Sequence, residues 1–258
     1  MILISCLQVF PVKHFQSLAK ERGLKMREGQ IIYGLSQIIQ AKKPKAFLLE
    51  NVKGLININD GKTLKEITSL LIQCGYQVSY KVLESTDYGI PQARERIYIV
   101  GIRNDLYKNV FNFPNSINEK INLQNFLIDK DERFVLRGNV YQTFLKYLEN
   151  KYNLGKYNLK DLLKQDYLVL DTRQSDLRLY YNKIPTLRTG RQGILYIKDN
   201  QIIKLSGLEA LLLQGFDLEK AQKAQANFSQ SSILAQAGNA MTVNVMQAIG
   251  TSILEYLS

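Results

Sequence analysis

Hydrophobic residues in the N-terminal part of the chain follow helix and strand periods in alternation. Residues 29–41 carry apolar side chains at helical spacing. The face expected to be buried consists of Ile31, Ile32, Leu35, Ile38 and Ile39. The short apolar run 45–52 is typical of a buried strand, residues 63–74 return to the helical period, and 76–83 and 96–102 have the composition of two further strands. This β-α-β rhythm predicts an α/β sheet covered by helices.

The regular alternation ends near residue 104. Residues 105–190 are rich in Asn, Lys, Tyr and Asp and show no repeated pattern, which predicts a smaller, irregular domain. Helical spacing returns after Leu205 and ends in a closing helix over 241–257. We therefore expect a main domain formed by residues 1–104 and 191–258, with the irregular domain inserted between its two parts.

The composition is that of a globular protein, with 45% apolar and 22% charged residues in a chain of 258. Lys and Arg outnumber Asp and Glu by 34 to 23, and a net charge of +11 suits a polyanion such as nucleic acid, although an inert basic surface would look the same. No apolar stretch is long enough for a membrane span, and no signal peptide is recognisable. Two cysteines predict a reducing, cytoplasmic location, and we expect no metal site.

Glu50 stands near the end of the predicted strand 45–52 and is followed by Asn51 and Val52. Open α/β sheets bind ligands at the carboxyl ends of their strands, where a carboxyl group can hydrogen-bond a ring nitrogen of a base. An ordinary helix-capping carboxylate is the alternative, and the tripeptide alone does not decide between them.

Arg94 and Arg96 follow a Gly-Ile-Pro-Gln turn and begin a predicted strand. In an extended segment their side chains point to the same face, where two guanidinium groups can clamp a phosphate or a base carbonyl. Two surface arginines at the start of a strand are the alternative.

Gly238 and Asn239 precede the closing helix. A Gly-Asn step at this place offers backbone N–H groups and a side-chain amide, which either cap the helix or bind a small polar ligand.

In this order and spacing, the three motifs make the chain resemble a bacterial DNA (cytosine-5) methyltransferase of the restriction-modification type. FLLENVKGL resembles the family's Glu-Asn-Val motif, DYGIPQARERIYIVGIR its Gln-x-Arg-x-Arg motif, and AGNAMTVNVMQAIG its closing Gly-Asn motif. KLSGLEALLLQGF is similar to the segment after the family's target-recognition domain, although Leu212 and Asp217 replace its usual Arg and Pro. The resemblance implies a partial Rossmann-like, S-adenosylmethionine-dependent methyltransferase sheet, with the target-recognition domain at residues 105–190.

The resemblance also implies roles for the matched residues. In the family a cysteine thiolate attacks C6 of a flipped-out cytosine, and C5 then takes the methyl group of S-adenosylmethionine. By position Glu50 would contact the base, while Arg94 and Arg96 would hold the cytosine carbonyl and a nearby phosphate. The cofactor would be contacted by Pro11, Ile31, Asn239 and Ala240.

Two loops rich in Arg, Thr and Gly, at 171–178 and 186–193, suit entry into a groove of double-stranded DNA. The expected DNA contacts are Arg173, Arg178, Arg188 and Arg191, and two solvated loops are the alternative. The tyrosines and lysines of residues 141–167 could contact phosphates, but such a stretch is more typical of an amphipathic helix with a solvated face, which we expect here.

The nucleophile of the family has no counterpart at its usual place. Its Phe-Pro-Cys-Gln motif aligns with Phe10 and Pro11, and the cysteine position is Val12, which has no lone pair for the attack. With permitted codons for residues 7–20, a shifted reading frame spells Thr-Gly-Phe-Pro-Cys-Gln-Thr-Phe-Ser-Ile-Ala-Gly-Lys, which is the family motif. We therefore hypothesise that about residues 6–20 are translated out of frame, and His14 has no role in this interpretation.

No Gly-rich cofactor loop occurs before residue 10. We therefore expect the first strands of the sheet to be absent, and the chain to be marginally stable unless a separate N-terminal methyltransferase half completes it. Three functions stay open at this point: a methyltransferase, an inactive remnant that still binds double-stranded DNA, and the C-terminal half of a split enzyme.

Overall fold

The structure, a computed structural model, describes residues 2–6, 27–117, 121–190 and 192–258. The chain forms two compact units. Unit 1 comprises Met1–Glu84, Glu95–Ser116 and Val245–Ser258, and unit 2 comprises Ser85–Arg94 and Ile117–Asn244. These limits differ from the expected ones at residues 104 and 190, because residues 85–94 and the three helices between residues 207 and 239 group with the irregular region.

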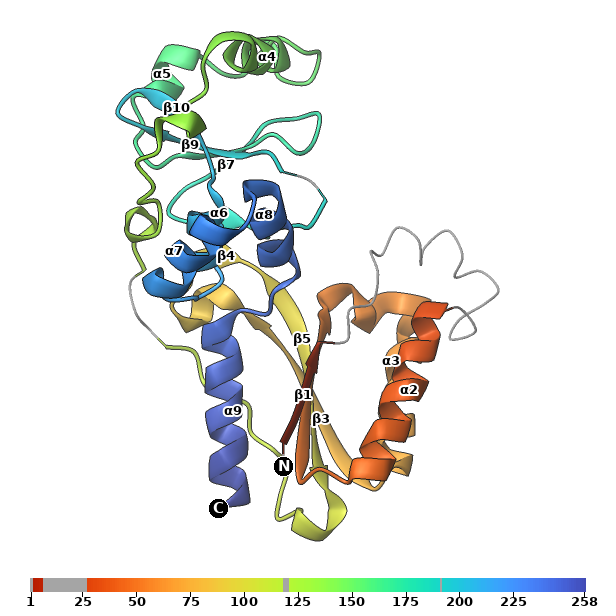
Figure 1. The fold of residues 1–258 in the computed structure, drawn as a ribbon. Coiled ribbons are helices and arrows are strands. Elements are labelled where there is room, and N and C mark those ends of the chain that lie inside the picture. Colours follow the sequence, from red (N-terminus) through yellow and green to blue (C-terminus); the bar gives the residue numbers. More distant parts are fainter. Residues whose placement is uncertain (1, 7–26, 118–120, 191) are drawn as a thin grey trace. The chain divides into compact units, whose positions relative to one another are not determined.

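Unit 1 is a four-stranded sheet with helices on both faces (Figure 1). The strands are β1 (Ile2–Cys6), β2 (Ala46–Val52), β3 (Tyr76–Glu84) and β5 (Glu95–Arg103), in the order β1-β2-β5-β3. The helices are α2 (Arg27–Lys42), α3 (Lys62–Gln73) and α9 (Val243–Leu257), and the 3-10 turns are η2 (Lys53–Gly61) and η4 (Asn104–Leu106). Only β1 and β2 pair in parallel, and the other pairs are antiparallel. The predicted α/β sheet is confirmed.

Helix α2 buries a narrower face than its spacing predicted. Ile32, Leu35 and Ile39 pack into the core between the helices and the sheet. Ile31 and Ile38, by contrast, are 43% and 50% exposed. Residues at i, i+3 and i+7 share one line along a helix, so the buried set leaves the adjacent line of Ile31 and Ile38 turned toward solvent.

The centre of this sheet is fitted around the ring of Phe47. Phe47 on β2 stands opposite Gly101 on β5, where an added Cβ would lie 2.1 Å from a ring atom. Tyr76 packs with a centroid separation of 5.0 Å and donates a 2.7 Å hydrogen bond to the carbonyl of Pro44. A glycine is therefore required at position 101 because the aromatic ring occupies the space of its side chain.

Unit 2 combines an antiparallel sheet with a layer of helices. The strands are β4 (Gln92–Ala93), β6 (Val169–Asp171), β7 (Arg178–Tyr180), β8 (Ile184–Pro185), β9 (Ile194–Lys198) and β10 (Gln201–Lys204). The helices are α4 (Gly138–Leu148), α5 (Leu159–Leu163), α6 (Gly207–Leu212), α7 (Leu218–Asn227) and α8 (Gln230–Asn239). The 3-10 turns are η3 (Ser85–Tyr88), η5 (Leu123–Asn125) and η6 (Glu132–Phe134). The sheet order is β10-β9-β6-β7, and β4 pairs in parallel with β8.

The amphipathic helix expected within residues 141–167 is interrupted. Helix α4 ends at Leu148, α5 begins at Leu159, and a loop over residues 149–158 separates them. Asn150 explains the break, because its Oδ1 accepts hydrogen bonds from the backbone N–H groups of Tyr152 and Asn153 and so stabilises a turn in place of the helix.

A buried carboxyl group joins the helices of unit 2 to its sheet. Glu209 of α6 is fully buried and accepts hydrogen bonds from Tyr196 Oη at 2.9 Å, Ser206 N at 3.0 Å and Asp129 N at 3.1 Å. Burial raises the pKa of Glu209 to about 7, although these three hydrogen bonds favour the charged form and oppose the shift. Ser206 and Glu209 also form the capping box of α6.

Candidate functional site

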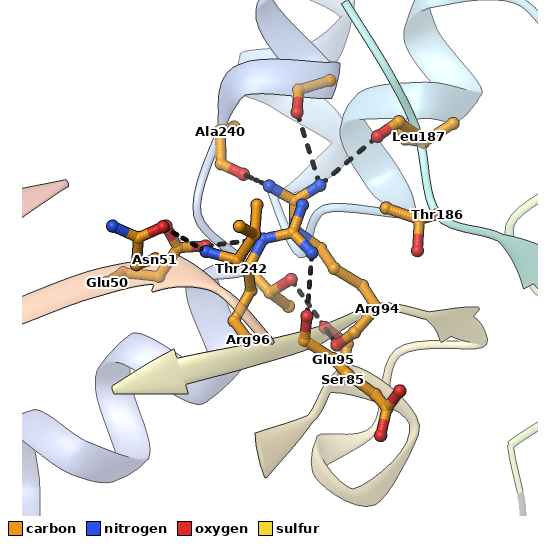
Figure 2. Close-up of polar contacts among 12 residues, drawn as sticks. Glu50, Asn51, Ser85, Arg94, Glu95, Arg96, Thr186, Leu187, Ala240 and Thr242 are labelled. Carbon is orange, nitrogen blue, oxygen red and sulfur yellow. Dashed lines mark hydrogen bonds and ion pairs between the residues drawn. The ribbon is translucent and has the colours of Figure 1, made fainter. Parts of the chain in front are cut away.

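Glu50 lies near the end of β2 and forms an ion pair with Arg96 in unit 1. Arg96 Nε is 3.0 Å from Glu50 Oε1, and the two side chains are 14% and 5% exposed. The pair follows from the strand register, because Glu50 and Val52 point to one face and Val52 stands opposite Arg96. The sheet thus holds a carboxylate and a guanidinium together at a strand end (Figure 2).

The end of β1 lies beside the same carboxylate. Cys6, the last residue of β1, is the register partner of Glu50 in the parallel pair with β2. The chain therefore enters the segment that contains Val12 from the strand position next to Glu50. Pro11 and Val12, like Arg191, lie outside the described residues.

Asn51 is a buried amide that the sequence singled out only as part of a motif. It is 2% exposed, and its Oδ1 accepts a 2.7 Å hydrogen bond from the N–H of Val52. Its Nδ2 has no hydrogen-bond partner among the described residues. An unmade hydrogen bond of this kind costs roughly 1–3 kcal/mol, so a bound group is favoured here.

Arg94 belongs to unit 2 and bonds backbone carbonyls. It is 3% exposed and donates from Nη1 to Leu187 O at 3.4 Å and Gly238 O at 3.3 Å, and from Nη2 to Ala240 O at 2.8 Å (Figure 2). The two arginines of the predicted clamp thus differ in their partners: Arg94 donates to backbone carbonyl oxygens, whereas Arg96 pairs with the carboxylate of Glu50. Arg94 thereby ties the 186–193 loop to the Gly-Asn motif.

Two buried glutamines continue this polar network within unit 2, and sequence reasoning gave neither a role. Gln92 donates to Leu213 O at 2.7 Å and accepts from Leu187 N at 3.0 Å. Gln214 donates to Ala237 O at 2.5 Å and accepts from the Thr242 hydroxyl at 3.2 Å. Their complete burial was the missing signal, since composition alone does not separate a buried glutamine from an exposed one.

The Gly-Asn motif ends one helix and precedes another. Gly238 and Asn239 are the last residues of α8, and α9 begins at Val243. The side-chain Oδ1 of Asn239 accepts a hydrogen bond from the Thr189 hydroxyl. A Cβ at Gly238 would lie 2.4 Å from the backbone of Arg188 and Thr189, so glycine allows the 186–193 loop to pack directly on the helix.

The expected DNA-contacting arginines differ in their surroundings. The Arg173 side chain is 3% exposed, with its Nε 2.7 Å from Asp171 Oδ1 and its Nη1 donating to Thr186 O at 2.7 Å. A DNA contact of Arg173 stays a sequence-based prediction. Burial alone would raise the pKa of Asp171, but hydrogen bonding and charge from Arg173 outweigh it and lower that pKa. Arg178 and Arg188 are exposed, as a DNA contact requires.

The described side chains contain no group of His, Cys, Asp and Glu able to hold a metal ion. Among the helices within the described ranges, none is long and apolar enough to cross a membrane.

Residues 7–255 match the sequence family described as C-5 cytosine-specific DNA methylase. The Type II methyltransferase M.HaeII of Haemophilus aegyptius is 33% identical over 263 residues, covering 96% of this chain and 73% of that protein. The Type II methyltransferase M.NgoBI of Neisseria gonorrhoeae is 32% identical, covering 93% of this chain and 70% of its own length. The crystal structure of the Dnmt2 methyltransferase of S. pombe is similar in fold, with a TM-score of 0.65 at 14% identity, and the match covers 99% of this chain and 78% of that one.

Proposed function

The chain belongs to the C-5 cytosine-specific DNA methylase family, and we propose that it binds double-stranded DNA through Glu50 and the basic loops of unit 2 without transferring a methyl group by itself. The family reaction moves a methyl group from S-adenosylmethionine to C5 of cytosine in DNA. The Glu50–Arg96 ion pair, at 3.0 Å near a strand end, is the observation that supports base binding.

The chemistry of the family reaction explains why Glu50 without a cysteine nucleophile does not suffice for methyl transfer. In the reaction a cysteine sulfur bonds to C6, C5 takes the methyl group, and loss of the C5 proton then expels the sulfur and restores the ring. Glu50 is suited to the base's N3 and exocyclic amine, and Arg96 to keeping Glu50 in place. Val12, at the aligned nucleophile position, cannot form the bond to C6.

The residues expected at the cofactor fit it unequally. Ile31 is an exposed apolar side chain on α2 and is suited to cover a flat ring. Asn239 presents an amide at the end of α8, while the Ala240 carbonyl already accepts from Arg94 and would contribute shape only. S-adenosylmethionine would supply the methyl group, and for each of these residues, as for Pro11, contact with it stays a sequence-based prediction.

A transfer assay tests the inactive state. Purified chain, labelled S-adenosylmethionine and DNA of mixed sequence should yield no labelled DNA, and any transfer above a no-protein blank would overturn the proposal. A chain in which residues 7–20 are replaced by the shifted-frame motif tests the hypothesis of a displaced frame. Sequencing the gene decides it directly, because codons that do not spell that motif in the shifted frame would refute it.

Within unit 1, one observation favours the split enzyme as a second candidate. Among the described strands β1 lies at the edge of the sheet and pairs only with β2. An edge strand offers unpaired backbone groups to a strand from another polypeptide. Co-expression with a polypeptide carrying the Gly-rich half should give a stable complex in this case, and separate elution of the two would exclude it.

A further inference from the structure

An exposed, basic loop joins α4 and α5 in unit 2. The loop spans residues 149–158 and contains Lys151, Tyr152, Leu154 and Lys156, all of them exposed. Gly155 has a φ of +75°, which L side chains rarely adopt, and it allows the chain to turn at the tip. Leu154 is 68% exposed and Tyr152 is 46% exposed, so two large side chains of this loop face solvent.

Two asparagine side chains, of which Asn153 is buried, bond the base of this loop to a neighbouring segment. Asn153 is 1% exposed and accepts from Leu177 N at 2.8 Å, while its Nδ2 donates to Tyr147 O at 2.9 Å and Ser175 O at 3.3 Å. Asn150 Nδ2 also donates to Ser175 O, at 2.9 Å. The loop is thus hydrogen-bonded to the β6–β7 connection, residues 172–177, which is followed at the start of β7 by Arg178, an exposed arginine and an expected DNA contact.

The same connection continues to the second arginine-rich loop. Arg173, two residues before Ser175, donates to Thr186 O at 2.7 Å, and Thr172 Oγ1 donates to Gly193 O at 2.9 Å. The loop 149–158, the β6–β7 connection and the 186–193 loop therefore form one hydrogen-bonded series within unit 2. The loop 149–158 thus belongs to the same hydrogen-bonded part of unit 2 as the two loops that are expected to contact DNA.

We propose that the loop tip 151–156 is a further DNA contact, in which Lys151 and Lys156 bind backbone phosphates and Tyr152 packs on sugar or base. This inference rests on the proposed function. The tip carries two lysines and no acidic residue. In sequence, the nearest acidic residue before the tip is Glu149, and the bonded β6–β7 connection contains Asp176. Lys151 Nζ lies 5.0 Å from the centre of the Tyr152 ring, so charge and aromatic surface are presented together.

The salt dependence of DNA affinity tests this assignment. Each phosphate contact contributes about 0.9 to the slope of log affinity against log salt concentration for duplex DNA. The double variant Lys151→Gln/Lys156→Gln should therefore reduce the slope by about 1.8, and affinity at low salt by about tenfold or more. The matched control Lys62→Gln/Lys65→Gln removes the same charge from exposed positions on α3 and should leave the slope close to that of the parent chain.

A second pair of variants separates contact from positioning. Tyr152→Ala should weaken binding with an unchanged slope, because it removes an uncharged contact. Asn153→Ala keeps both lysines but removes the hydrogen bonds that hold the loop to the β6–β7 connection. It should increase the rate of amide hydrogen exchange at residues 174–177 and, with it, lower the affinity for DNA. A wild-type slope in the lysine variant would overturn the loop assignment alone, whereas a parent chain that binds no DNA would overturn the proposed function as well.

Discussion

Two arginines, two positions apart in the sequence, illustrate how differently the two units are held together. Arg96 in unit 1 neutralises a carboxylate on a sheet whose stability comes from apolar packing around Phe47. Arg94 in unit 2 has carbonyl oxygens as its described partners, within a network that includes Gln92 and Gln214. The apolar packing of unit 1 is therefore sensitive to added side-chain volume, whereas the polar network of unit 2 is sensitive to the loss of a hydrogen-bond donor.

The largest effect is expected from Arg94→Met in unit 2. The substitution keeps much of the apolar side-chain length but leaves the carbonyls of Leu187, Gly238 and Ala240 without this donor, and should lower the free energy of unfolding by roughly 3 kcal/mol. Urea denaturation measures it. Arg133→Met, at an 81% exposed arginine of unit 2 paired with Asp131, is the control and should cost less than about 1 kcal/mol. Equal losses in the two variants would remove the contrast.

A slightly smaller effect is expected from Gly101→Ala in unit 1. The new methyl group would overlap the Phe47 ring, and overpacking of a core of this kind costs typically about 1–3 kcal/mol. The double variant Gly101→Ala/Phe47→Leu should recover part of that loss. Gly34→Ala on α2, where nothing lies within 4 Å, is the control and should stabilise the helix by up to about 1 kcal/mol. Thermal unfolding of the three variants gives the comparison, which fails if position 101 accepts alanine without loss.

The pH dependence of unit 2 should follow Glu209. Its pKa is raised from 4.5 to about 7 in the folded chain, so the folded state binds a proton that the unfolded state has released between these values. The stabilisation is present in full below pH 4.5 and is lost as the pH rises through 7, with a slope of up to about 1.4 kcal/mol per pH unit. Unfolding measured from pH 4 to 8 should show this fall. Glu209→Gln cannot titrate and should remove it, and an unchanged profile in the variant would assign the dependence elsewhere.

The smallest effect is expected at the exposed ion pair of Lys53 and Glu95. The side chains are 53% and 44% exposed and lie 2.6 Å apart. Exposed pairs of this kind contribute about 0–1 kcal/mol, so Glu95→Gln should change the free energy of unfolding by less than about 1 kcal/mol. A double-mutant cycle with Lys53→Met measures the coupling, and a value as large as that of the buried network would contradict the distinction between them.

The family and the α/β sheet could be predicted from the amino-acid sequence, and the motif residues Glu50, Arg94, Arg96 and Asn239 could be identified in it. The spacing of hydrophobic residues indicates which side of a helix or strand is buried, and the order of residue types in a motif indicates the chemistry it can perform. Both can therefore be predicted from the sequence. The missing thiol at Val12 is likewise a property of the sequence alone.

The partners of these side chains, by contrast, follow from the three-dimensional packing. Burial of Arg173 with Asp171, the assignment of Arg94 to carbonyl oxygens, and the bonding of the 149–158 loop to the β6–β7 connection all join residues distant in the chain or hidden by packing. A polar residue has the same letter whether it is solvated or buried, and its role is set by the groups that folding places within hydrogen-bond distance.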